Sequence, residues 1–145
     1  MTQRVLIVDD SPDDIEMLER FLAEMGVSIR SVSDPAAAED AFKQFGPDLV
    51  LLDLHMPKVD GLEILRRLRG ERSDEGFVPV VVLSGDQTKV ARNSALVLGA
   101  DDFLTKPLDR QEVVLRVRNL LRTRQLYVEL TQVNKALMRE LNQPT

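Results

Sequence analysis

Five polar side chains in this 145-residue chain stand at the ends of apolar segments, and their types could do chemistry together. They are three carboxylates, one hydroxyl and one ammonium: Asp9, Asp10, Asp53, Ser84 and Lys106. Carboxylates held close together raise one another's pKa unless a positive charge compensates them. One lysine cannot neutralise three carboxylates, whereas a hard divalent cation with oxygen ligands would. The set therefore predicts a site for Mg²⁺, or for Mn²⁺ in its place, and such a cation suits phosphate chemistry.

The apolar segments that must position these groups are short and rich in Val, Ile and Leu, which is typical of strands buried on both faces. Four of them precede or contain the polar side chains: residues 5–8, 48–54, 78–84 and, more weakly, 100–105. A fifth segment, residues 27–33, alternates apolar and polar side chains and suits an edge strand with one wet face.

Between these strands lie segments with apolar residues at helical spacing. Gly26 ends the first of them, and Gly46-Pro47 ends the second. In the fourth, we expect an apolar face made of Val90, Ala91, Ala95, Leu96 and Leu98. Five strands alternating with five helices predict an α/β protein with a doubly wound parallel sheet, whose strand order the pattern leaves open. Ligands of such sheets bind at the carboxyl ends of the strands, where the five polar residues would meet.

Four motifs occur in order at these strand ends: VLIVDDSP, VLLDLHMPKVDG, VVVLSG and GADDFLTKPL. Together they resemble the response-regulator receiver domain of two-component signal transduction, over about residues 4–122. The resemblance implies a flavodoxin-like fold, a five-stranded parallel sheet in the order 2-1-3-4-5 with five helices. We therefore expect a receiver domain over residues 1–122 and a helical extension over residues 123–145.

The resemblance also implies a role for each matching residue. Asp53 would accept a phosphoryl group from a kinase phosphohistidine. Asp10, Asp53 and the backbone carbonyl of His55 would bind Mg²⁺ directly, and Asp9 would act through water. Ser84 and Lys106 would each bind a phosphoryl oxygen. These roles predict a phosphorylation-dependent response regulator that catalyses only its own phosphorylation and dephosphorylation, and not an enzyme with a separate substrate.

Further positions follow from the same resemblance. The Lys106–Pro107 peptide bond would be cis, and Ser84 and Phe103 would form the conformational switch, although Phe103 could instead be simply a core residue. His55 and Asp86 would flank the pocket entrance and affect the lifetime of the acyl phosphate. A side-chain role for His55 as a ligand or general base is the less favoured interpretation.

Asp13 and Asp14 receive a different interpretation from the nearby Asp9 and Asp10. They come after Ser11-Pro12, a pattern typical of a helix N-cap followed by proline at the first helical position. Acidic residues in a first helical turn interact favourably with the helix dipole. We therefore expect this second pair only to start a helix.

The last helical segment is longer than a receiver domain needs. No Gly or Pro interrupts residues 109–141, which corresponds to about 50 Å of helix at ~1.5 Å per residue. Leu126, Leu130, Val133 and Leu137 recur at the spacing of a coiled-coil seam. We expect a homodimer through the fourth helix, fifth strand and fifth helix together with this extension, and a histidine kinase or phosphotransfer protein as partner.

Composition and motifs exclude several other classes. The net charge of −5 argues against direct nucleic-acid binding, although the segment from residue 109 onward is basic. No apolar run is long enough for a membrane span, and the lack of cysteine fits a cytoplasmic protein. A haloacid-dehalogenase-type phosphatase needs a second Asp two residues after the nucleophile, where this chain has His55 or Ser11. A receiver-like module that never takes phosphate would not need the complete set of pocket residues.

Overall fold

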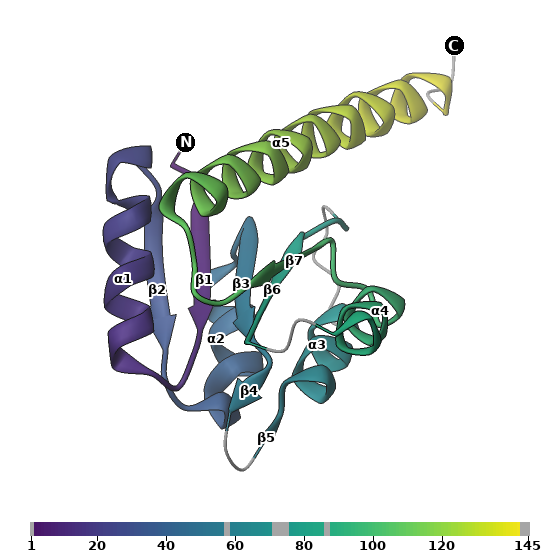
Figure 1. Ribbon diagram of the computed structural model, residues 1–145. Coiled ribbons are helices and arrows are strands. Elements are labelled where there is room, and N and C mark those ends of the chain that lie inside the picture. The colour runs from purple at the N-terminus through teal and green to yellow at the C-terminus, as the bar shows by residue number, and fades with distance from the viewer. Residues whose placement is uncertain (1, 57–58, 71–75, 86–87, 143–145) are drawn as a thin grey trace.

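The computed structural model describes residues 2–56, 59–70, 76–85 and 88–142. Five parallel strands form one sheet in the order β2-β1-β3-β6-β7 (Figure 1). Because β4 and β5 belong to a separate small sheet, β6 and β7 are the fourth and fifth strands of the main sheet, and the predicted order 2-1-3-4-5 is confirmed. The strands are β1 (Arg4–Val8), β2 (Ser28–Val32), β3 (Leu49–Asp53), β6 (Val80–Ser84) and β7 (Asp102–Thr105). The alternating segment forms β2 at one edge of the sheet, as its pattern predicted.

Five α-helices alternate with these strands: α1 (Pro12–Leu22), α2 (Ala38–Phe45), α3 (Gly61–Gly70), α4 (Lys89–Val97) and α5 (Arg110–Leu141). Two short 3-10 helices, η1 (Ala23–Met25) and η2 (Pro35–Ala37), lie after α1 and before α2. Gly26 follows η1 with φ 69° and Gly46 ends α2 with φ 62°, a left-handed conformation that glycine adopts without steric cost.

The helices cover both faces of the sheet. On one face α1 and α5 pack over side chains such as Ile7, Leu51 and Leu83. On the other face α2, α3 and α4 pack over their neighbours in the strands, such as Val8 and Leu52. Because successive side chains of a strand point to opposite faces, the central strands must be apolar throughout. The uninterrupted runs of Val, Ile and Leu in the sequence are the result.

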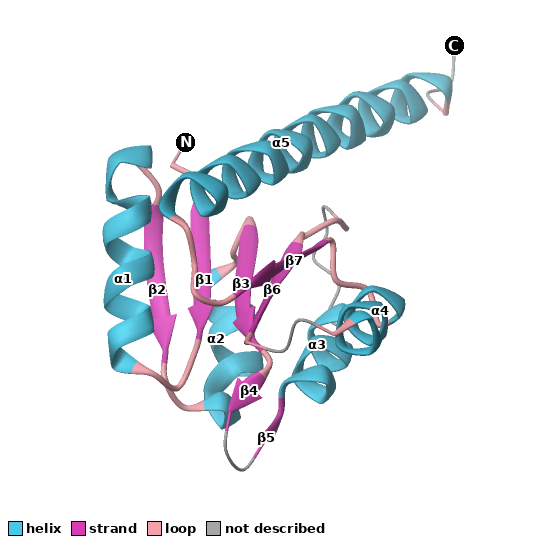
Figure 2. Cartoon of the chain, viewed as in Figure 1, coloured by secondary structure: helices cyan, strands magenta, loops and turns pink. Residues whose placement is uncertain are grey.

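Two short strands that the sequence did not predict follow β3. β4 (His55–Met56) pairs antiparallel with β5 (Val59–Asp60) at the carboxyl ends of the main strands (Figure 2). Gly61 starts α3 directly after this pair, and a Cβ atom there would lie 2.5 Å from Leu54 Cα. Only glycine allows the chain to return so closely to the end of β3.

The predicted apolar face of the fourth helix is partly wrong. In α4 only Ala95 is buried, whereas Val90 is 75% and Leu96 41% exposed. Ala91 and Leu98, one turn to either side of Ala95, are partly buried and share its side of the helix. Since successive residues turn by about 100°, Val90 and Leu96 lie beside this narrow stripe and not on it.

The long α5 helix contacts the body over its first half and then projects beyond it (Figure 1). Contacts with the body continue past residue 122. Arg124 is 6% exposed and donates to the Phe77 carbonyl at 2.6 Å, and the Tyr127 ring lies 5.7 Å from that of Phe77. The predicted domain boundary at residues 122–123 stays a prediction. Among the described residues, no helix has the length and apolar character needed to cross a bilayer.

Candidate functional site

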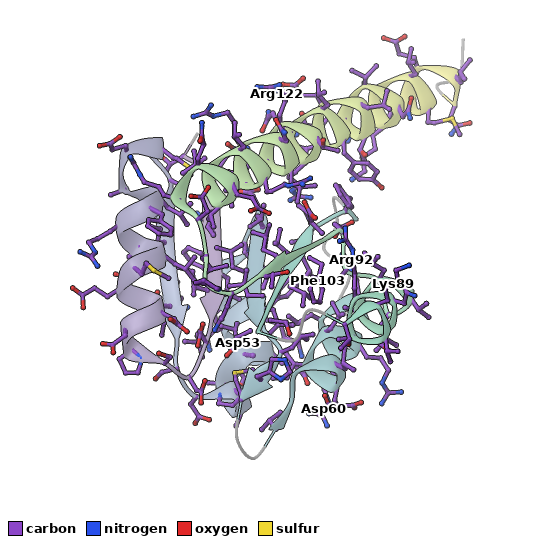
Figure 3. All side chains as sticks on the ribbon, viewed as in Figure 1. Asp53, Asp60, Lys89, Arg92, Phe103 and Arg122 are labelled. Carbon is purple, nitrogen blue, oxygen red and sulfur yellow. The ribbon has the colours of Figure 1, made fainter. Side chains whose placement is uncertain are left out.

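The ends of four strands bring the chemistry-bearing residues together. Asp9 directly follows β1, and Asp53 and Ser84 are the last residues of β3 and β6. Ser84 pairs with Thr105 in the sheet, and the backbone N–H of Lys106 donates to the Ser84 carbonyl at 2.8 Å. Figure 3 shows Asp53 at the carboxyl edge of the sheet. Parallel register therefore places all four groups at one edge, as the sequence predicted.

Three carboxylates form a compact acidic cluster at this edge. One oxygen each of Asp9, Asp10 and Asp53 lies within 4.8 Å of the others. Asp9 and Asp53 are buried, whereas Asp10 is partly exposed. An oxygen-only ligand set that is open to water on one side fits a hard cation that keeps bound water, such as Mg²⁺.

The surroundings of Asp9 disfavour its ionised form, mainly because the carboxyl is buried. Burial is the largest effect and raises the pKa of Asp9 from 3.8 to about 6. The Ser11 N–H, which donates to Asp9 Oδ1 at 3.0 Å, lowers this pKa, and the charge of Asp53 raises it again. Lys106 lowers it as well, but not enough to restore the ordinary value. A cation bound at this cluster would favour the ionised carboxylate of Asp9 and so offset the cost of its burial.

Among the described residues, Lys106 is a cation that reaches the cluster. Its Nζ lies 2.8 Å from Asp14 Oδ2, 3.3 Å from Asp9 Oδ2 and 3.4 Å from Asp53 Oδ1. Burial lowers the pKa of Lys106, but the hydrogen bond to Asp14 and the charges of Asp53 and Asp9 raise it more, so the net shift is upward. The ammonium is therefore fully charged at neutral pH.

The expectation that Asp14 only starts a helix is wrong. Ser11 does cap α1, since its side chain accepts from the Asp14 N–H at 3.3 Å. The Asp14 carboxylate, however, also binds Lys106. A signal for this contact was present in the sequence, because Asp14 lies four residues before the buried Leu18 and hence on the same side of α1. Asp13 is exposed, consistent with a role in the helix start alone.

The His55 side chain reaches back into the site. Its Nε2 lies 2.6 Å from the hydroxyl of Ser84, which is buried, and its backbone N–H donates to Asp53 Oδ1 at 3.1 Å. The sequence placed this side chain at the pocket mouth and did not predict its contact with Ser84. Asp86, the other residue expected at the entrance, lies outside the described residues.

The remaining predicted positions lie on and after β7. The Lys106–Pro107 peptide bond is cis. Phe103 is buried in the core on the side of α2, α3 and α4, and Figure 3 shows it between the sheet and α4. An inward position fits both interpretations of this residue, switch and core.

Fold and site together define a class of protein: a parallel α/β sandwich with buried acids and a lysine at the carboxyl edge of its sheet. The family model for the response regulator receiver domain matches residues 5–118, and the chain belongs to this family. This membership confirms the resemblance that the four motifs at the strand ends indicated.

Individual relatives agree. The transcriptional regulatory protein TrcR of Mycobacterium tuberculosis is 39% identical over 119 residues, which are 82% of this chain and 45% of TrcR. Response regulator MprA of the same organism is 39% identical over 122 residues, 84% of this chain and 52% of MprA. The BeF3-activated receiver domain of Klebsiella pneumoniae RstA superposes with a TM-score of 0.75 at 27% identity, covering 83% of this chain and 99% of that domain. The chain spans about half the length of the curated relatives it matches.

Proposed function

We propose that Asp53 accepts a phosphoryl group from a histidine kinase or a phosphotransfer protein and that this event switches the protein's conformation. One observation carries the proposal: the buried Asp53 carboxylate lies within 4.8 Å of Asp9 and Asp10 and 3.4 Å from the Lys106 ammonium. Phosphoryl transfer depends mainly on positioning and on stabilising the charge of the transferred group, and this pocket offers both.

The chemical step requires little from the protein beyond this arrangement. An Asp53 carboxylate oxygen attacks the phosphorus of the donor phosphohistidine, the P–O bond forms as the P–N bond breaks, and the leaving imidazole takes a proton from solvent. Asp10, Asp53, the His55 carbonyl and, through water, Asp9 would hold Mg²⁺, which would supply electrostatic stabilisation of the phosphoryl oxygens. Lys106 pairs with a further phosphoryl oxygen. Hydrolysis of the acyl phosphate by water at the same site resets the protein.

Ser84 and Phe103 would pass the change on to the surface. The Ser84 hydroxyl binds a phosphoryl oxygen and thereby moves the end of β6. Phe103 lies on β7, in register with Val82 of the same strand β6. Because Phe103 is already buried, a shift of β6 changes its packing against α4 directly.

Intact-mass measurement after incubation with Mg²⁺ and a small phosphodonor such as phosphoramidate tests the proposal. The wild type is expected to gain one phosphoryl group and Asp53→Asn none. Asp60→Asn is the matched control, because Asp60 is an exposed aspartate next to the site whose carboxylate accepts from the Leu62 N–H, a role that Asn can fill. Equal adducts on wild type and Asp53→Asn, or no adduct on the wild type, would contradict the proposal.

The α5 extension supports a proposal about the output. Leu126, Leu130, Val133 and Leu137 are between 51% and 60% exposed. We propose that residues 123–145 form a helical extension, attached to the body at its start through Arg124 and Tyr127, and that this seam pairs two copies, together with the surface of α4, β7 and α5. Moving a two-state protein from mostly inactive to mostly active takes about 5.5 kcal/mol of differential stabilisation. Burial of two such seams is one source of that energy.

Light scattering with and without beryllofluoride, a phosphoryl mimic, tests the pairing. We expect the mass to double on activation and this increase to be lost in Leu130→Asn. Met138→Asn is the control, since Met138 is equally exposed but lies off the seam. An unchanged mass in the activated wild type rejects the pairing. We further propose that this 145-residue chain does not itself bind nucleic acid, because the net charge of the whole chain is −5.

A further inference from the structure

Both side chains that would bind phosphoryl oxygens already have partners from outside the acidic cluster. Lys106 Nζ hydrogen-bonds Asp14 Oδ2 at 2.8 Å, and Ser84 Oγ lies 2.6 Å from His55 Nε2. Neither Asp14 nor the His55 imidazole belongs to the three carboxylates that converge on the proposed metal position. Each therefore contacts a phosphoryl-binding group without a place in the chemistry described above.

Asp14 is the partner that Lys106 holds most closely. The 2.8 Å distance is typical of a charge-assisted hydrogen bond, whereas the distances to Asp9 and Asp53 are 3.3 and 3.4 Å. Both side chains of the pair are mostly shielded from water, with 22% of Lys106 and 30% of Asp14 exposed. The shortest of the three contacts of the ammonium is therefore with α1 and not with the carboxylate that would carry the phosphoryl group.

His55 has the corresponding position with respect to Ser84. Its backbone N–H is bound to Asp53 Oδ1, so the residue is anchored beside the phosphoacceptor while its imidazole contacts the hydroxyl. Ser84 is buried at the end of β6, and the imidazole 2.6 Å away occupies one of the hydrogen-bonding directions of its hydroxyl, whichever of the two groups donates. A phosphoryl oxygen that approaches from this side would have to displace the imidazole.

We propose that Asp14 and His55 form a resting-state lock: they compete with the phosphoryl group for Lys106 and Ser84, and so set how tightly the site takes that group. The inference rests on the proposed function and adds its regulation. Asp14 and His55 act through other residues and are positioning residues. Their contacts must be given up when the acyl phosphate forms and are regained when it is hydrolysed, which favours the unphosphorylated state.

Calorimetric titration with beryllofluoride at saturating Mg²⁺ tests the Asp14 half of the lock. Asp14→Asn keeps the size of the side chain but weakens its hold on Lys106, and we expect about fivefold to tenfold tighter binding. Asp13→Asn is the matched control: it removes the same charge from the same helical turn, but Asp13 is exposed and has no described contact with Lys106. The control should bind within about twofold of the wild type.

The His55 half is tested by a pair of variants. His55→Ala removes the contact with Ser84 and should bind beryllofluoride more tightly, whereas His55→Gln, whose amide can reach the hydroxyl, should return toward wild-type affinity. A purely structural role would not give this rescue. Equal affinities of Asp14→Asn and Asp13→Asn, or weaker binding by Asp14→Asn or His55→Ala, overturn the lock. Failure of the proposed function is distinct, because the wild type would then not bind beryllofluoride at all.

Discussion

Replacing Asp9 with Asn should stabilise the metal-free protein, although it removes a charge that the site needs. The pKa of Asp9 is raised from 3.8 to about 6, chiefly by burial, so its ionised form is disfavoured in the folded state. One pKa unit corresponds to ~1.4 kcal/mol, and a shift of about two units therefore costs roughly 3 kcal/mol at neutral pH. Asn retains the oxygen that accepts from the Ser11 N–H at 3.0 Å. Its amide is a poorer partner for Lys106, which reduces the expected gain to about 2 kcal/mol.

The sign of the effect predicts its pH dependence. Because the folded-state pKa of Asp9 lies above the unfolded one, the destabilisation is absent below pH 3.8, where the carboxyl is protonated in both states. It grows as pH rises and is complete above about pH 6. The advantage of Asp9→Asn over the wild type should follow the same course.

Urea unfolding with a chelator, at about pH 7.5 and about pH 4, measures this difference directly. Asp13→Asn is the control: it removes an exposed charge from the first turn of α1 and should lose about 0.3–1 kcal/mol instead of gaining stability. Saturating Mg²⁺ should shrink or reverse the gain, since the wild type then binds the cation better. An Asp9→Asn variant that is less stable than the wild type in chelator at the higher pH would refute the reasoning, as would a gain independent of pH.

Three further predictions concern the Asp9 site, the start of α3 at Gly61 and the contact of Arg124 with the body. Because protons compete for Asp9 with a pKa of about 6, the apparent Mg²⁺ affinity should fall by up to about tenfold per pH unit below that value, and a flat calorimetric profile would contradict this. Gly61→Ala places a Cβ 2.5 Å from Leu54 Cα and should cost about 1–3 kcal/mol of stability in chemical unfolding. Arg124→Met leaves the Phe77 carbonyl without its 2.6 Å donor and should cost about 1–3 kcal/mol, whereas Met at the exposed Arg122 of the same helix should cost little (Figure 3).

Much of the fold could be predicted because local chemistry carries it. Short apolar runs rich in Val, Ile and Leu are typical of buried strands, Gly26 and Gly46 can end helices with positive φ, and Ser11 can cap the helix that follows. The arrangement of Asp9, Asp53, Ser84 and Lys106 follows from the fold class, since the carboxyl ends of parallel strands share one edge. For these residues the position in the chain determines the position in space.

The contacts that the sequence missed depend on distances between elements that no local pattern contains. Asp14 is an ordinary helix-start acid until the packing of α1 on the sheet brings its carboxylate to Lys106, which lies 92 residues away. His55 follows the last residue of β3 by two positions, and no local pattern shows that the imidazole of this exposed residue lies 2.6 Å from the Ser84 hydroxyl, 29 residues further along the chain. Val90 and Leu96 match a helical apolar face, but both are exposed, because the packing of α4 against the rest of the fold decides which side of the helix is buried.

The sequence by itself therefore determined which elements form, which family the chain resembles and which groups meet at the strand ends. Tertiary structure alone decided how those groups are partnered before any phosphoryl group arrives, and how far α5 stays attached to the body through Arg124 and Tyr127. The physical reason is the distance along the chain over which each kind of interaction acts. Propensity, capping and periodicity act over a few residues, whereas a hydrogen bond across the fold depends on helix placement to within about half an ångström.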